Sequence, residues 1–316
     1  MTTTLLLHQP DRPLRLGTRG SPLALTQARM VITALRDAQG WDENAVEIVA
    51  IKTSGDMIQD RALAEVGGKA LWTKELDRAL IDGDIDFAVH SMKDVETIRP
   101  SAIIIAAMLP RADVRDRLIG AASIDTLPEG GRIGTSSPRR SAQVRRSRPD
   151  IEIVLFRGNV DTRLAKLAGG EAEATLLAGA GLDRLGRGNI GTAIPTEIML
   201  PAPAQGAVGI ETLAARDDMR TALAAIDHQA THICVLAERA LLAALGADCR
   251  SPVAALAVEH GDAIHLRAEI LSEDGSEHCS GDMLLSRAAL AEDAARLAGN
   301  LLADASPALR QLFTGP

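Results

Sequence analysis

Short apolar runs alternate with amphipathic segments through the first two thirds of the chain. The short runs are typical of strands, and the segments between them repeat their apolar residues every three or four positions, as helices do. This alternation predicts α/β domains with open sheets. We expect strands at residues 14–17, 46–52, 87–91, 103–108, 132–135, 151–156 and 174–178, and helices at 23–38, 71–81 and 162–167.

From about residue 228 the pattern changes. A strong helical segment at 230–245 precedes alternating strands at 254–258, 264–271 and 279–285, and a helix at 288–302 follows. This order predicts a separate, smaller α+β domain. We therefore expect three domains, with domain 1 at 1–108 and 207–224, domain 2 at 113–201 and domain 3 at 228–316.

Two strand-to-helix turns, at 16–22 and 133–138, repeat each other. Both end a predicted strand, offer a serine as the N-cap and place a proline at the first helical position. Exposed N–H groups at such a helix start can bind an anion. Any strand-to-helix turn favours Ser-Pro, but each of these also carries an arginine beside the cap, Arg19 or Arg139. The repetition predicts two similar lobes that face one cleft.

The charge distribution supports an anion-binding site. The chain is acidic, with a net charge of −8, yet residues 132–166 contain nine Arg/Lys against three Asp/Glu. The fork of an arginine binds carboxylate or phosphate through two hydrogen bonds, so the stretch is interpreted as a pocket for a ligand with several negative charges. The alternative is a solvated basic helix face.

Composition excludes several other classes. A pI near 5.4, two Trp, three Phe and no Tyr argue against a nucleic-acid surface. The first residues lack the pattern of a secretory signal and no apolar run is long enough to span a membrane, so we expect a cytoplasmic protein. Three widely spaced cysteines indicate neither a disulfide framework nor a zinc site, and no metal is expected.

Two residues are candidates for chemistry. Asp94 follows the predicted strand at 87–91 and is preceded by Lys93, so both emerge where α/β folds place reacting groups. Among many cations, Asp94 would stay ionised and could stabilise a cationic intermediate or transfer a proton. An ordinary surface ion pair is the alternative.

Cys249 lies in a polar turn, whereas Cys234 falls in an apolar helical pattern and is interpreted as a buried core residue. His228 and His232 lack further metal ligands at suitable spacing and are expected at the surface.

Taken together, these motifs resemble the porphobilinogen deaminase family, also called the hydroxymethylbilane synthases. The resemblance extends over nearly the whole chain. It rests on Gly17-Thr18-Arg19, Ser21-Pro22-Leu23-Ala24-Leu25, Val66-Gly67-Gly68-Lys69, Lys74-Glu75-Leu76, Ala88-Val89-His90-Ser91-Met92-Lys93-Asp94, Gly134-Thr135-Ser136-Ser137, Arg139-Arg140, Arg157-Gly158-Asn159-Val160, Thr162-Arg163-Leu164 and Gln205-Gly206-Ala207-Val208-Gly209-Ile210-Glu211.

The resemblance implies a monomeric transferase of tetrapyrrole and haem biosynthesis. It would join four porphobilinogen molecules into linear hydroxymethylbilane with release of ammonia, without nucleic acid or membrane. It also implies two periplasmic-binding-protein-like α/β domains, a smaller third domain and a dipyrromethane cofactor held covalently by Cys249. The implied catalytic residue is Asp94. The implied cofactor-binding residues are Ser91, Lys93, Thr135, Ser137, Arg139, Arg140, Arg163 and Arg184, and the implied substrate-binding residues are Arg19, Ser21, Lys69, Trp72, Arg157, Arg163 and Gln205.

The chain departs from the family's pattern at a few positions. Pro203-Ala204 stands where Val-Gly is usual, and Asp248, Arg250 and Ser251 surround Cys249 where other residues are common. Glu65 and Trp72 also differ from the residues that are common at their positions. Between them, Gly67-Gly68-Lys69 is expected to form a loop tip, which is either a mobile surface loop or an active-site lid.

Two further functions remain open from the sequence alone. Paired α/β lobes also describe a non-catalytic anion-binding protein, which would close on its ligand without turnover and would have no use for Cys249. A cysteine-dependent transferase with an exchangeable thioester is the other alternative, and hydroxylamine would release an adduct of that kind.

Overall fold

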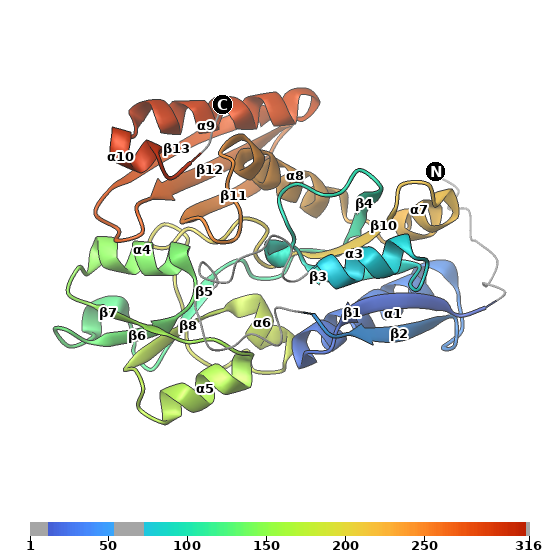
Figure 1. Ribbon diagram of the computed structural model, residues 1–316, viewed down its shortest axis with the longest axis horizontal. Coiled ribbons are helices and arrows are strands. Elements are labelled where there is room, and N and C mark those ends of the chain that lie inside the picture. The colour runs from blue at the N-terminus through green and yellow to red at the C-terminus, as the bar shows by residue number, and fades with distance from the viewer. Residues whose placement is uncertain (1–11, 54–72, 314–316) are drawn as a thin grey trace. The chain divides into compact units, whose positions relative to one another are not determined.

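A computed structural model of the chain describes residues 12–53 and 73–313 (Figure 1). The described residues form two compact units. The first unit contains residues 12–53, 73–112 and 207–232, and the second contains 113–206 and 233–313. The chain thus passes between the units after residues 112, 206 and 232. The boundaries of the three expected domains stay a prediction.

The first unit is built on a five-stranded sheet of order β2-β1-β3-β10-β4. β1 pairs in parallel with both β2 and β3, whereas β10 is antiparallel to β3 and to β4. The strands are β1 (Leu14–Arg19), β2 (Val46–Ile51), β3 (Phe87–Ser91), β4 (Ile103–Met108) and β10 (Val208–Leu213).

Helices α1 (Pro22–Gln39), α3 (Lys74–Ile81) and α7 (Asp217–Ala224) pack on this sheet. Val31 and Leu35 of α1 share a buried cluster with Leu16 and Phe87 of the strands. α1 is followed by its C-cap, Gly40, whose φ of 69° is left-handed and favours glycine. A single 3₁₀ turn, Met92–Asp94, follows β3.

The second unit contains a sheet of the same design, in the order β7-β6-β8-β5-β9. β6 is parallel to β7 and β8, and β5 is antiparallel to β8 and β9. The strands are β5 (Asp116–Ile119), β6 (Arg132–Thr135), β7 (Glu152–Leu155), β8 (Ala174–Ala178) and β9 (Thr192–Ala193), and the helices are α4 (Pro138–Ser147), α5 (Val160–Ala168) and α6 (Gly179–Arg184).

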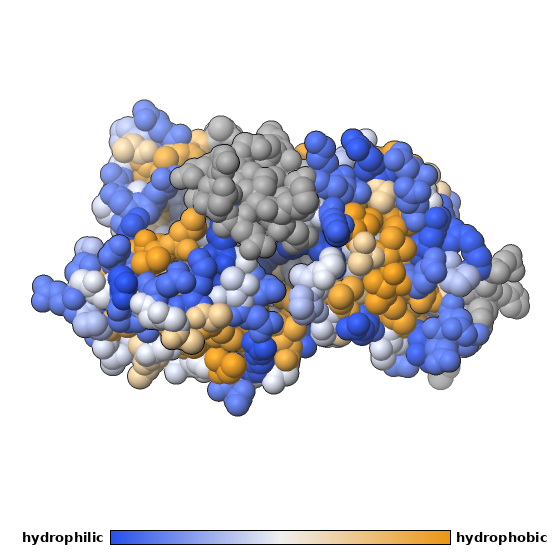
Figure 2. All heavy atoms as spheres, turned by 60° about the horizontal axis from the view of Figure 1, so that its bottom comes forward, coloured by the Kyte–Doolittle hydropathy of each residue, from blue (hydrophilic) through white to orange (hydrophobic). Residues whose placement is uncertain are grey.

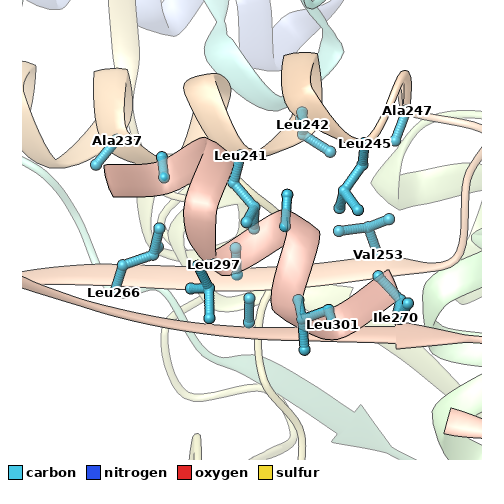
Figure 3. Close-up of a cluster of buried hydrophobic side chains, with 14 of the residues drawn as sticks. Ala237, Leu241, Leu242, Leu245, Ala247, Val253, Leu266, Ile270, Leu297 and Leu301 are labelled. Atoms are coloured by element: carbon cyan, nitrogen blue, oxygen red, sulfur yellow. The ribbon is translucent and has the colours of Figure 1, made fainter. Parts of the chain in front are cut away.

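The second unit also contains a three-stranded antiparallel sheet, β11-β12-β13. Side chains from α8 and α9, including Leu241 and Leu297, meet Val253 and Ile270 of the strands in one apolar cluster (Figure 3). The elements are α8 (Gln229–Ala244), β11 (Val253–His260), β12 (Ala263–Leu271), β13 (His278–Ser286), α9 (Leu290–Asp304) and α10 (Pro307–Arg310).

The expected fold class, two similar α/β sheets with a smaller sheet-and-helix part, is confirmed. Four predicted strands, at 87–91, 103–108, 132–135 and 174–178, have the observed bounds. The helix expected at 71–81 begins at Lys74, and its first two positions lie outside the described residues. The expectations did not include β5, β9, β10, α6, α7 or α10.

No described helix combines the length and the apolar character that crossing a bilayer requires. On the face drawn in Figure 2, hydrophobic residues form separate patches between hydrophilic ones. The described residues also contain no group of three or more His, Cys, Asp or Glu side chains arranged to hold a metal ion.

Candidate active site

In the first unit, the carboxyl ends of β1 and β3 bring two candidate residues together. The two strands are parallel neighbours, so the residues that follow them emerge at one edge of the sheet. Nη1 of Arg19 lies 3.9 Å from Oδ2 of Asp94. Asp94 is 40% exposed and Arg19 21%, so the carboxylate is open to solvent beside a cation. A carboxylate in this position can stabilise a nearby positive charge.

Met92 holds the turn that carries Asp94 against the neighbouring strand of the sheet. Met92 is buried, and its N–H donates to the carbonyl oxygen of Ala207 at 3.1 Å. Gly209 of the neighbouring strand β10 lies so close that a Cβ there would overlap the Met92 side chain. The absence of a side chain at Gly209 therefore allows the 3₁₀ turn to sit directly on the sheet.

Serine side chains fix the same edge. Ser21 caps α1, since its Oγ accepts from the N–H of Ala24, as the Ser-Pro pattern predicted. Ser91 and the amide group of buried Gln27 are hydrogen-bonded, with Nε2 to Oγ at 2.8 Å and Oγ to Oε1 at 3.1 Å. Ser91 is thereby tied to α1 at the position from which the 3₁₀ turn starts.

A buried charged network lies behind this edge. Glu211 of β10 has no exposed surface, and both its oxygens accept from Arg99 at 2.8 Å. Arg99 also binds Asp77, and Nε2 of His90 lies 3.1 Å from Glu211 Oε2. Burial alone would raise the pKa of Glu211, but His90 and Arg99 outweigh burial and lower that pKa to about 2. We call Glu211, Arg99, Asp77 and His90 the first-unit network.

In the second unit, the repeated Ser-Pro turn begins α4. Ser137 caps the helix by accepting from the N–H of Arg140, as predicted, and its own N–H donates to Oγ1 of buried Thr135 at 3.2 Å. Gly134, like Gly209, faces a bulky neighbour, because a Cβ there would overlap the ring of Phe156. The two serine-capped helix starts of the sequence analysis are confirmed as local structure.

Arg139 and Arg140 do not face solvent. They are 3% and 5% exposed, and both bind Asp116 of β5, which has no exposed surface. Arg139 Nη2 donates to Oδ2 at 2.7 Å, and Arg140 Nη2 donates to Oδ1 at 2.7 Å. Burial would raise the pKa of Asp116, but the charges of the two arginines hold it below its usual range. Gln205, which is also fully buried, donates from Nε2 to Asp116 Oδ1 at 2.9 Å.

The other candidate arginines of this unit lie on or before helices. Asn159 caps α5 by accepting from Thr162, and Arg163 of that helix donates from Nε to the Gly158 carbonyl oxygen at 3.0 Å. Arg157, just before the cap, is 6% exposed. Arg184, at the end of α6, donates from Nη2 to the Gly206 carbonyl oxygen at 2.7 Å.

Cys249 lies in the turn between α8 and β11 and is exposed, whereas Cys234 is buried, as expected, and Cys279 is half-buried. Two hydrogen bonds close the turn. The N–H of Ser251 donates to the carbonyl oxygen of Asp248 at 3.0 Å, and the N–H of Asp248 donates to Oγ of Ser251 at 3.1 Å. Arg250 forms an ion pair with Asp248 at 2.7 Å. The thiol therefore lies on a turn that hydrogen bonds hold in place, next to Arg250, whose charge is balanced by Asp248.

These observations leave the predicted roles of the site residues as predictions. The first unit carries Arg19, Ser21, Ser91, Lys93 and Asp94, and the second unit carries the remaining described candidates. Lys69 and Trp72 lie outside the described residues. Two buried carboxylates, Asp116 and Glu211, were missed. Glu211 ends a motif already quoted, but Asp116 stands among arginines in a polar segment that gave no strand pattern.

The second unit has donors that suit a carboxylate-bearing group. Nε of Arg139 and Nε of Arg184 are buried without an acceptor among the described residues. Burial lowers the pKa of both arginines, because their charged forms have lost water. Both still stay cationic at neutral pH. An anionic cofactor therefore fits the chemistry of this unit, and Cys249 supplies an accessible thiol.

Comparison with known proteins assigns the family. Residues 14–221 match the family model "Porphobilinogen deaminase, dipyromethane cofactor binding domain", and residues 232–305 match "Porphobilinogen deaminase, C-terminal domain". The chain therefore belongs to the porphobilinogen deaminase family. The predicted class, a transferase, and the predicted dipyrromethane cofactor are confirmed at the level of this family.

Curated relatives agree with this assignment. A porphobilinogen deaminase of Sphingopyxis alaskensis is 59% identical over 315 residues, which cover 97% of this chain and 98% of the relative. A porphobilinogen deaminase of Paracoccus denitrificans is 50% identical over 276 residues, which cover 86% and 88% of the two chains.

Two solved structures have a more distant likeness to this chain. A double mutant of the VFT2 domain of Bordetella pertussis BvgS has a TM-score of 0.39 and 15% identity, with 68% of this chain and 85% of the domain covered. A TRAP periplasmic solute binding protein from Desulfovibrio salexigens has a TM-score of 0.41 and 11% identity, with 69% and 73% covered.

Proposed function

We propose that this chain is a hydroxymethylbilane synthase, which condenses four porphobilinogen molecules head to tail and releases ammonia at each condensation. The product is a linear hydroxymethylbilane for tetrapyrrole and haem biosynthesis. The growing chain starts on a dipyrromethane cofactor joined to Cys249 by a thioether. Family membership over both matched parts of the chain supports this reaction.

The observation that carries the proposal is the environment of Cys249. It is the exposed cysteine of the three, and it stands on a turn held by Asp248 and Ser251. A covalent tether needs an accessible thiol at a fixed position. Cys234 is buried, and burial raises the pKa of the Cys279 thiol, which opposes formation of its reactive thiolate.

Asp94 is the proposed catalytic residue. Loss of ammonia from the aminomethyl group of porphobilinogen leaves a positively charged, azafulvene-like pyrrole. An exposed carboxylate can stabilise that charge, and the same oxygen can accept the proton that the new carbon–carbon bond displaces. The guanidinium of Arg19 lies 3.9 Å from this carboxylate.

The second unit would hold the carboxylates. Each pyrrole brings an acetate and a propionate group, so bound pyrroles present several negative charges. The bound cofactor would supply a free pyrrole α-carbon as the nucleophile. Arg184 and the pair Arg139 and Arg140 would bind its carboxylates, because their cationic charge exceeds what the described carboxylates around them compensate.

The proposal includes a monomer that acts in the cytoplasm without nucleic acid or membrane. The net charge of −8 supports the absence of a polyanionic partner. Elution at the mass of one chain in size-exclusion chromatography is the expected result.

The intact mass of the purified protein tests the proposal. We expect the wild type, after incubation with porphobilinogen, to carry a stable excess that equals two linked pyrroles. Cys249→Ser should lack the excess, and the matched control Cys279→Ser should retain it. Hydroxylamine should leave the excess in place, since a thioether resists it and a thioester does not. A wild type that stays unmodified, or an adduct retained by Cys249→Ser, would contradict the proposal.

A further inference from the structure

Asp116 occupies an unusual position between two neighbouring arginines. Consecutive residues of an α-helix point about 100° apart, so Arg139 and Arg140 of α4 would not meet by helix geometry alone. Asp116 Oδ2 accepts from Arg139 at 2.7 Å, and Oδ1 accepts from Arg140 at 2.7 and 3.2 Å. One carboxylate therefore draws two guanidinium groups to the same place, and it also offsets their repulsion.

The protein uses only part of each guanidinium. A guanidinium has five N–H donors. Among the described residues, Arg139 donates to Asp116, Gln143 and the Leu200 carbonyl oxygen, which are three bonds. Arg140 also makes three bonds, two to Asp116 and one to the Leu176 carbonyl oxygen. Two donors on each side chain are left, and one of them is the buried Nε of Arg139.

Asp116 is itself held in place. Gln205 donates from Nε2 to Asp116 Oδ1 at 2.9 Å and to the Val114 carbonyl oxygen at 2.7 Å. Val114 precedes β5, and Gln205 lies just before the point where the chain returns to the first unit. One amide group thus fixes the carboxylate relative to the backbone of its own strand.

We propose that Asp116 is a positioning residue, which holds Arg139 and Arg140 so that their remaining donors can bind carboxylates of the dipyrromethane cofactor, and that Gln205 fixes Asp116 for this task. This inference rests on the proposed function. The cluster carries two cations and one anion, so it keeps one positive charge for a ligand. Neither Asp116 nor this arrangement was expected from the arginine-rich sequence.

The test uses a variant that keeps the charge and moves it. Asp116→Glu retains the carboxylate but adds one methylene, so the two guanidinium groups shift. The full chain, expressed without a source of porphobilinogen, is incubated with porphobilinogen at several concentrations. The conversion to the cofactor-bearing mass is followed over time. We expect the half-saturating concentration to rise about tenfold, the effect of one lost charge-assisted hydrogen bond.

A structural role would give another result. If Asp116 only stabilised the fold, Asp116→Glu would lower the fraction of chains that convert and leave the half-saturating concentration unchanged. Asp150→Glu is the matched control, because Asp150 also pairs with an arginine, Arg148, at 2.6 Å but near the surface. The control should behave as the wild type does. An unchanged half-saturating concentration for Asp116→Glu overturns the proposal.

A second variant decides the question if Asp116→Glu does not fold. Gln205→Leu leaves both arginine–aspartate pairs in place and removes the amide that fixes Asp116. We expect its half-saturating concentration to rise about threefold, as for one neutral hydrogen bond. A value equal to that of the wild type overturns the proposal. A wild type that never acquires the cofactor mass would instead contradict the proposed function, so the two failures are distinguishable.

Discussion

The two five-stranded sheets share one topology but differ in the charge that they bury. In each sheet the fourth strand is antiparallel to the third and carries a carboxylate without exposed surface, Glu211 on β10 and Asp116 on β5. Glu211 meets one arginine, Arg99, which is shared with Asp77. Asp116 meets two, and no second carboxylate among the described residues pairs with either of them.

This difference assigns a separate task to each sheet. The first-unit network holds two carboxylates, one arginine and His90, and the same unit carries Asp94 at the exposed edge of its sheet. The cluster around Asp116 has a positive surplus, which suits the binding of carboxylates. The same strand order thus supports a carboxylate for chemistry in one unit and a cationic site in the other. The side chains on each sheet therefore determine its function, whereas the strand topology alone does not specify it.

The largest effects on stability are expected when the two buried carboxylates, Asp116 and Glu211, are neutralised. Asp116→Asn leaves two buried guanidinium groups without an anion, which we expect to lower the free energy of unfolding by about 3–5 kcal/mol. Glu211→Gln should lower it by about 1–3 kcal/mol, because Arg99 keeps Asp77. Hydrogen exchange of the β5 and β10 amides reports each unit separately. Equal losses, or a larger loss for Glu211→Gln, would contradict the conclusion that Asp116 balances more buried charge than Glu211 does.

Acid should destabilise the first unit through Glu211. Its pKa is lowered from 4.5 to about 2 in the folded protein, so its stabilising contribution is present above pH 4.5 and is lost as the pH falls toward 2. The contribution is about 3 kcal/mol at neutral pH. Urea unfolding at pH 6 and pH 3 measures the larger part of this contribution, because pH 3 lies between the two pKa values. Glu211→Gln should depend less on pH than the wild type, and an identical dependence would show that Glu211 does not contribute.

A smaller effect concerns the support of Asp94. Gly209→Ala places a methyl group against Met92, so the 3₁₀ turn that carries Asp94 must shift. We expect a loss of about 1–3 kcal/mol in the free energy of unfolding, as for other overpacked sites, together with lower turnover. Gly134→Ala should destabilise the second unit similarly through Phe156 and affect turnover less. Equal turnover for both variants would argue against the proposed role of the turn.

The smallest effect is expected at Ala204. This residue has a φ of 60°, the one positive φ among the described residues other than glycine. Its N–H donates to Glu238 at 2.5 Å, which holds the backbone in this conformation. Ala204→Gly should raise the free energy of unfolding by about 1 kcal/mol, because glycine adopts a left-handed φ without strain. An unchanged or lower melting temperature would contradict this expectation.

The sequence predicted the local features well. The strands at 87–91 and 132–135 and the serine caps of α1 and α4 depend on residues that are close in sequence, and the structure confirms them. β10 was missed because its partners, β3 and β4, precede it by about a hundred residues, and an apolar pattern does not reveal such pairing. β5 was missed because Asp116 and Arg117 open a strand of only four residues.

The site was predicted in part for the same reason. The sequence identified the cations at 139 and 140 and interpreted them as ligand-binding, but it could not show that Asp116, more than twenty positions earlier, takes part of their hydrogen-bonding capacity. The environment of Cys249 was easier to predict, since the turn that exposes it is closed by its own neighbours. Contacts distant in sequence are therefore what separate the predicted site from the observed one.

The division of tasks between the two units is tested most directly with Asp94→Asn. The variant should acquire the full cofactor mass, because the carboxylate-binding residues of the second unit are unchanged. Ammonia release from porphobilinogen should fall several hundredfold to a thousandfold, the usual effect of removing one group that stabilises developing charge. Full occupancy with strongly reduced turnover is the predicted result, and near-normal ammonia release by Asp94→Asn would contradict the account.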